Sequence, residues 1–262
     1  MKAFFAGLFS ENLSASLGDI TLFSIWHFVY LFIIFGGAIL LACLLKNKSD
    51  KAKDLTLKIF AYLTIGLYLA DFFIMPLSDS YVGISAYKLP FNICTIMAAF
   101  VPFVQFNKKF EPIKGTIVML SITSAVMWMC YPGSALGGQP PFCYLIFQTF
   151  MYHGFLFTWA FLQICFKRTT VNIKNIWKEA IGVLCILVWA WFGNTIYDAG
   201  YNWFFIETSI FPFLSDGIMP LMSVLSVIVC CAAVYGIYYA VIAIMKKISN
   251  KTKKQEVIKD AE

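Results

Sequence analysis

Cys94, Thr95, His27 and His153 are the residues of this 262-residue sequence whose types point most directly to covalent chemistry. A histidine close to a thiol in a low-dielectric pocket can take up the thiol proton, and the resulting thiolate attacks an ester carbonyl. Thr95 is the competing nucleophile. Its side chain points about a hundred degrees away from that of Cys94 on a helix. The sequence leaves open whether His27 or His153 acts as the base.

Motifs for bound metals and nucleotides are missing from the sequence. No Cys/His group has the spacing of zinc ligands. There is also no P-loop, GxGxxG or GxSxG pattern. We therefore expect neither a metal ion nor a cofactor.

The composition places these residues in a membrane protein. Hydrophobic residues make up 60% of the chain and charged residues 13%, against about 45–50% and about 25% in soluble domains. Seven apolar stretches come close to the ~20 residues that span a bilayer. We predict an all-α, polytopic transmembrane bundle of seven helices, at Ile20–Leu45, Leu57–Met75, Leu89–Phe106, Ile113–Met129, Phe142–Phe166, Trp177–Thr195 and Ile218–Met245.

The basic residues predict the orientation of this bundle. All except Lys2 and Lys88 lie in alternate loops or in the C-terminal tail. The positive-inside rule then places the N-terminus outside and the C-terminus in the cytoplasm. The net charge of +6 is thus a topology signal with some attraction for anionic lipid, and we expect no nucleic-acid partner.

Three regions follow from this topology: an outer-face segment at 1–19, the transmembrane domain at 20–246 and a basic cytoplasmic tail at 247–262. The strong excess of Lys over Arg hints at an AT-rich bacterial genome, so we expect a multi-pass protein of a bacterial plasma membrane. Cys130 and Cys143 flank one outer loop, where a disulfide would form in an oxidising compartment.

Polar residues gather in the outer half of the predicted bundle, while the inner half holds almost none. Because polar groups are costly in a bilayer, function is the first hypothesis for them. We predict a pocket between the first, second, third and fifth helices, lined by His27, Asp71, Cys94 and His153. Interhelical hydrogen bonding is the alternative reading. The wider set of candidate substrate-binding residues is His27, Asp71, Asn92, Gln148, Tyr152, Asn194 and Asp216.

Three segments resemble the YwaF-like family of integral membrane proteins. Leu89-Pro-Phe-Asn-Ile-Cys94 resembles its LP-x-H-x-C signature, with Asn92 in place of the histidine. Phe147–His153 is similar to its FFQ-then-His helix, and Gly193–Tyr197 to its GTN-Y segment. The family includes a mammalian membrane acyltransferase that acts on phospholipids, and it is distantly similar to membrane hydrolases that use Thr and His. The resemblance implies that Cys94 is the nucleophile and His153 the base.

The sequence is therefore compatible with two functions. The first is a lipid acyltransferase or lipid-ester hydrolase, with membrane phospholipid acyl esters as its partners. The second is a small-solute transporter or binding protein that uses the same polar pocket. The sequence shows no internal repeat, and this weighs mildly against transport.

Overall fold

The computed structural model describes residues 18–77, 88–132, 139–197, 202–207 and 216–259. Seven α-helices lie in these ranges, joined in places by single 3-10 turns, and no strand occurs there beyond an isolated bridge between Ile20 and Gln139. The helices are α3 (Ile25–Leu45), α4 (Asp50–Ile74), α5 (Ile93–Phe106), α6 (Glu111–Cys130), α7 (Tyr144–Cys165), α8 (Ile176–Tyr197) and α9 (Met219–Lys259). The predicted all-α helical bundle is confirmed. The predicted segment 1–19 lies almost wholly outside the described residues.

Polar caps determine where several helices begin. Ser24 accepts a hydrogen bond from the His27 amide, and Ser49 accepts one from the Ala52 amide. These side chains replace the intrahelical partners that first-turn amides lack. Pro112 stands in the first turn of α6, where its missing N–H costs nothing. The cap at Ser49 starts α4 seven residues before the predicted Leu57.

Six of the helices are long and apolar enough to cross a membrane. The exception is α5, whose 14 residues reach only about 21 Å at 1.5 Å per residue, less than the ~30 Å hydrocarbon core. Asn107 ends α5, and its side chain caps the next turn instead. The chain is thus a multi-pass membrane protein in which α5 is a short inner helix.

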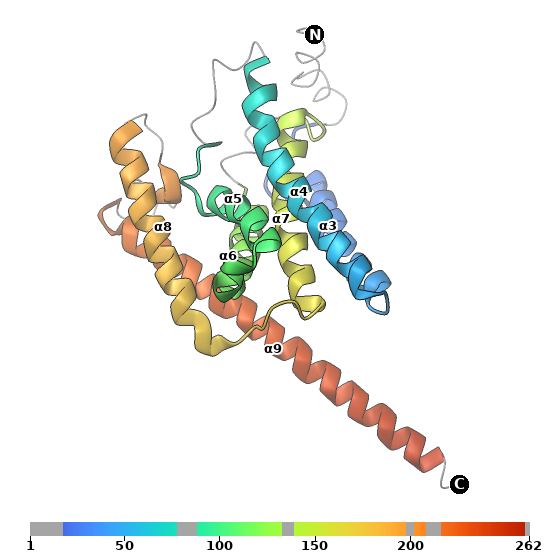
Figure 1. The fold of residues 1–262 in the computed structure, drawn as a ribbon. Coiled ribbons are helices and arrows are strands. Elements are labelled where there is room, and N and C mark those ends of the chain that lie inside the picture. The colour runs from blue at the N-terminus through green and yellow to red at the C-terminus, as the bar shows by residue number, and fades with distance from the viewer. Residues whose placement is uncertain (1–17, 78–87, 133–138, 198–201, 208–215, 260–262) are drawn as a thin grey trace.

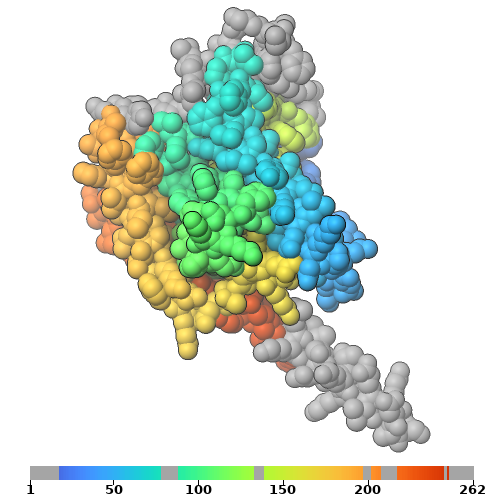
Figure 2. Space-filling model, in the orientation of Figure 1, coloured from blue at the N-terminus to red at the C-terminus, as the bar shows by residue number. Residues whose placement is uncertain are grey.

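The centre of the bundle is formed by α6 and α7. In the most apolar stretch of α7, 67% of the residues are buried, against 17% in α3 and in α9. Figure 2 shows the end of α5 and the start of α6 (green) between α3 and α4 on one flank and α8 on the other. Residues of α7 therefore face protein on most sides, and this suits a helix that carries functional groups.

The loops with most of the basic residues lie together at one end of the bundle, which we call the basic face. There Arg168, just after α7, forms ion pairs at 3.0 Å with Asp50 and Asp54 at the start of α4. At the opposite face, the Tyr30 hydroxyl of α3 donates to the Pro141 carbonyl just before α7. The helices thus alternate in direction as the charges predict, while the side that faces the cytoplasm stays a prediction.

The basic tail predicted from residue 247 is continuous with the last helix. Helix α9 runs without a break for 41 residues to Lys259, a length of about 62 Å. Figure 1 shows it extending well beyond the other helices. Its last turns carry the lysines of the tail, so this basic segment is helical.

Candidate functional site

One face of α6 carries the side chains that contact Cys94 and His153. The Cys94 thiol on α5 lies within hydrogen-bonding reach of the Ser124 side chain. The His153 ring on α7 stacks on Trp128, with ring centroids 4.0 Å apart and planes 6° apart. Ser124 and Trp128 are four residues apart on α6, so they share a face at about 5–6 Å spacing. The residues of α6 that contact Cys94 and His153 therefore lie one turn apart.

The tautomer of His153 follows from its hydrogen bond. Its Nδ1 lies 2.8 Å from the Thr149 carbonyl oxygen, which can only accept, so Nδ1 carries the proton in the neutral ring. Nε2 is then an unprotonated acceptor. No hydrogen bond to Nε2 occurs among the described residues. His153 is 5% exposed and presents one free basic nitrogen within the bundle.

Tyr152 stands beside both groups. Its ring meets that of His153 edge-on, with centroids 4.6 Å apart, and its hydroxyl lies within electrostatic range of Cys94. The hydroxyl is buried and has no hydrogen-bond partner within the described part of the chain. A buried polar group without a partner costs free energy, and such an atom next to a nucleophile is a candidate donor to a ligand.

Thr95, the competing nucleophile, is bound to the backbone. Its hydroxyl lies 2.8 Å from the Asn92 carbonyl and 3.3 Å from the Leu89 carbonyl, and it donates its proton there. A nucleophilic hydroxyl has to give its proton to a base, but here two carbonyls hold it. The geometry favours Cys94 over Thr95.

Asp71 lies in a charged cluster near the opposite face. It is 1% exposed and forms an ion pair with Lys88, and its other oxygen accepts from the Tyr144 hydroxyl at 2.8 Å. Lys88 also donates to Gln148, whose amide donates to the Leu67 carbonyl. The carboxylate therefore holds Lys88 and Tyr144 and bonds to neither histidine.

His27 is tied to the backbone through both ring nitrogens. Nδ1 accepts from the Phe23 amide at 3.1 Å, and Nε2 donates to the Met129 carbonyl at 2.7 Å. The ring thereby joins the start of α3 to the end of α6. This geometry leaves no nitrogen of His27 for a substrate.

Asn92 and Asn194 both hold the short 3-10 turn η6 (Trp203–Phe205). Asn92 accepts from the Phe204 amide, and Asn194 bonds to both the amide and the carbonyl of Trp203. Phe204 has a φ of 59°, which is uncommon for a bulky residue, so these bonds hold a strained turn. The side chain of Asp216, in the 3-10 turn η7 (Asp216–Ile218), is not among those described.

The half of the bundle near the basic face holds more polar residues than we predicted. Gln105 accepts from Trp159 at 2.9 Å and from Gln163 at 2.8 Å. Glu179 is 1% exposed and accepts from the Tyr235 hydroxyl. The prediction that this half holds almost no polar groups is wrong, because these side chains find partners on neighbouring helices.

The sequence left open whether Cys130 and Cys143 are bridged by a disulfide. Both cysteines are free thiols, Cys143 buried and Cys130 exposed. Among the described residues, no three His, Cys, Asp or Glu side chains group as a metal ion would require.

Sequence reasoning missed Lys88, Ser124 and Trp128. Lys88 could have been noticed, since it is one of two basic residues outside the basic loops. It lies between α4, which carries Asp71, and α5. Ser124 and Trp128 could not, because one serine and one tryptophan in an apolar helix look like ordinary packing residues.

The comparison with protein families covers all seven helices. The model of the TMEM164 family matches residues 22–238, from just before α3 into α9. The chain belongs to the TMEM164 family. This match does not support the YwaF-like naming or a bacterial source. No curated protein and no solved structure matches the chain.

Proposed function

We propose that this member of the TMEM164 family transfers or hydrolyses lipid acyl esters, with Cys94 as nucleophile and His153 as base. The observation that carries the proposal is the fixed tautomer of His153. Its Nδ1–H is held by the Thr149 carbonyl at 2.8 Å, and its ring stacks on Trp128, one turn of α6 from the Ser124 side chain that contacts Cys94. This is the arrangement of base and orienting group that activates a nucleophile.

The first half-reaction forms an acyl thioester. Nε2 of His153 takes the Cys94 proton, and the sulfur attacks the carbonyl carbon of a lipid ester. The C–O bond to the glycerol oxygen breaks, and that oxygen leaves with the proton from His153. The acyl group is then bonded to Cys94 through a C–S bond.

The second half-reaction releases the acyl group. The hydroxyl of a lysolipid or of water gives its proton to Nε2 and attacks the thioester carbonyl, and the C–S bond breaks as Cys94 regains a proton. A lysolipid acceptor gives transfer, and water gives hydrolysis. The Tyr152 hydroxyl, which is buried without a partner among the described residues, can donate to the carbonyl oxygen while it carries negative charge.

The apolar surroundings suit such a substrate. Trp128 stacks on the His153 ring, and the fully buried Phe150 packs on Trp128 with ring centroids 5.3 Å apart, so the surroundings of His153 are apolar. A charged solute would find its partners already engaged, because Asp71, Lys88 and Gln148 bind one another. These features favour the enzyme over the transporter reading.

The test is to trap the thioester in purified protein in nanodiscs. A phospholipid with a labelled acyl chain should label the protein in a hydroxylamine-sensitive manner, and Cys94→Ala should abolish both label and turnover. Cys43→Ala is the matched control, since Cys43 is an exposed cysteine on α3. His153→Ala should slow labelling at least a hundredfold. Turnover that persists in Cys94→Ala would refute the mechanism.

A further inference from the structure

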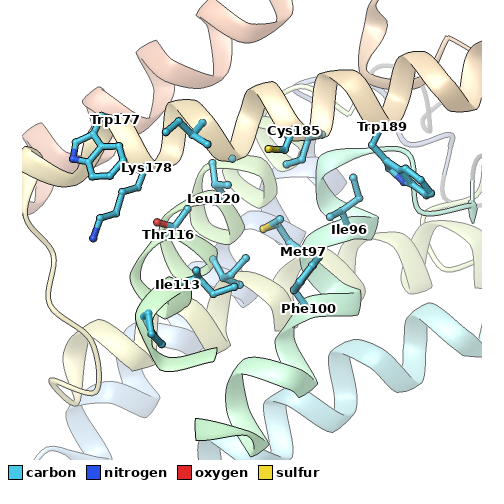
Figure 3. A pocket seen from close by; sticks show the side chains of 15 residues that line it. Ile96, Met97, Phe100, Ile113, Thr116, Leu120, Trp177, Lys178, Cys185 and Trp189 are labelled. Carbon is cyan, nitrogen blue, oxygen red and sulfur yellow. The ribbon is translucent and has the colours of Figure 1, made fainter. Parts of the chain in front are cut away.

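A long apolar groove lies between α5, α6 and α8, away from the Cys94 site. Its volume is about 540 Å³, within the range of about 300–1,000 Å³ typical of ligand pockets. Figure 3 shows Trp177 and Lys178 at one end and Trp189 at the other. Twelve residues of α8 separate the two tryptophans, a span of about 18 Å. One leaflet of the ~30 Å hydrocarbon core is about 15 Å thick, so the groove has the length of one lipid chain.

A polar pocket continues this groove at the basic face. Its volume is about 250 Å³, and it shares Pro112, Thr116 and Lys178 with the groove. The start of α6, the loop after α7 and the start of α8 form its walls. A hydrocarbon slot that opens into a small polar chamber at the membrane surface has the shape of one lipid molecule with its headgroup.

Two lysines of the polar pocket have no ion-pair partner. Arg168 is engaged by Asp50 and Asp54, and Glu111 pairs with Lys114 at 3.6 Å. Lys167 and Lys178 form no ion pair within the part of the chain that the structure describes. Lys178 also lies over the Trp177 ring, 5.6 Å from its centroid. Two ammonium groups without a carboxylate partner that line one chamber attract a phosphate.

The backbone of Lys167 supports a role for its charge. The Arg168 amide bonds to the Gln163 carbonyl at 2.8 Å and the Lys167 amide to the Ile164 carbonyl at 3.0 Å, which closes α7 in a Schellman motif. In this motif Lys167 takes the position that glycine usually fills. Its φ of 57° costs about 1–2 kcal/mol for a residue with a side chain. A strained residue of this kind points to a functional use of the side chain.

Glu179 is the buried acidic residue of the polar pocket, which Glu111 also lines. It lines the chamber and is 1% exposed, and it accepts from the Tyr235 hydroxyl at 3.3 Å. It also bonds to the Thr116 side chain, and Lys178 acts on it electrostatically without an ion pair among the described residues. A buried carboxylate without a direct cation contact is costly, and a primary ammonium group on the ligand would supply that contact.

We propose that the groove and the polar pocket together bind one aminophospholipid. One acyl chain lies along α8 between Trp177 and Trp189, and the phosphate binds Lys167 and Lys178. The headgroup ammonium binds Glu179. This lipid site is separate from Cys94 and does not depend on the proposed acyl chemistry.

Fluorescence of the groove tryptophans tests the proposal. The full chain is placed in nanodiscs of phosphatidylcholine with brominated chains, which quench tryptophan, and unbrominated lipids are titrated in. Phosphatidylethanolamine should restore the fluorescence at a mole fraction at least fivefold lower than phosphatidylcholine or phosphatidylglycerol. Trp177→Phe should remove part of this lipid-dependent signal.

Three variants separate the parts of the site. Lys178→Gln should weaken the effect of every phospholipid at least fivefold, and Glu179→Gln should remove only the preference for phosphatidylethanolamine. Lys167→Gly should keep or raise the melting temperature, since glycine suits that backbone, and yet weaken lipid binding. Lys174→Gln is the control, because Lys174 lies in the same loop region but does not line the pocket.

Two outcomes would overturn the proposal. Identical titrations for the three headgroups, unchanged in Lys178→Gln and Glu179→Gln, would mean that the groove holds bulk lipid only. Equal competition by water-soluble glycerophosphoethanolamine would mean that the pocket binds a free phosphate compound and that the groove takes no part.

Discussion

Asp71 and Lys88 form an ion pair inside the bundle. Near the end of the bundle opposite the basic face, other polar side chains bond to this pair. The Asp71 side chain is 1% exposed and that of Lys88 17%. Tyr144 donates to the carboxylate, Lys88 also donates to Gln148, and the Tyr68 hydroxyl donates to the Lys88 carbonyl. The pair thereby joins α4 and α7 to the segment that leads into α5.

Removing one member of this pair should destabilise the protein more than removing both. Lys88→Met leaves a buried carboxylate without its cation, and Asp71→Asn leaves a buried ammonium, so each should cost about 3–5 kcal/mol. The double variant should recover at least half of that loss. Thermal unfolding in detergent of the four proteins measures the cycle. Additive losses would show that the two charges do not interact.

His27 is expected to matter for stability and not for chemistry. His27→Phe fills similar space but leaves the Met129 carbonyl and the Phe23 amide without their partner. The loss should be about 1–3 kcal/mol. Turnover per folded molecule should stay within twofold of the parent protein. A hundredfold fall in turnover at unchanged melting temperature would instead assign a catalytic role to His27.

Seven helices could be predicted from the sequence because each span is apolar and the basic loops alternate. The helix ends could be predicted less well, since caps such as Ser49 extend α4 into charged residues. The functions of single polar residues were the hardest to predict. Asn92 and Asn194 look like pocket residues in the sequence, yet their partners lie in η6, and this pairing depends on the tertiary fold.

The same limit applies to the candidate site. Cys94 and His153 stand out by residue type, but their partners on α6, Ser124 and Trp128, carry no distinctive pattern. The tautomer of His153 could have been anticipated, since a histidine in mid-helix commonly bonds to the carbonyl four residues earlier. The free Lys167 and Lys178 were visible only as topology signals, because nothing in the sequence tells which basic residues find acidic partners.

A Thr95 variant tests the choice between Cys94 and Thr95 as nucleophile, which the sequence left open. Thr95→Val removes the bonds to the Asn92 and Leu89 carbonyls, which should lower stability by about 1 kcal/mol. Acyl transfer should fall by less than threefold, whereas Cys94→Ala should abolish it. The measurement is turnover of a labelled phospholipid by each purified variant. A reversed order would make Thr95 the nucleophile.

Gly193 permits a close contact between α8 and Phe91, two residues before the start of α5. A Cβ at this position would lie 2.5–2.8 Å from three atoms of the Phe91 ring, and that ring is itself packed against Trp189 and Trp203. Gly193→Ala should therefore cost about 1–3 kcal/mol through overpacking. Adding Phe91→Leu should recover part of the loss in a melting experiment. Gly36→Ala is the control, since nothing lies within 4 Å of its added Cβ.

Tyr152 offers the sharpest separation of stability from catalysis. Its hydroxyl is buried without a partner among the described residues, so Tyr152→Phe should leave the melting temperature unchanged or raise it. If the hydroxyl donates to the oxyanion during attack by Cys94, kcat should fall about 10²–10³-fold, with little change in KM. Tyr68→Phe is the matched control, because the Tyr68 hydroxyl already donates to the Lys88 carbonyl at 2.7 Å. That variant should lose stability and keep kcat. Equal kcat in Tyr152→Phe and the parent protein would exclude the hydroxyl from the reaction.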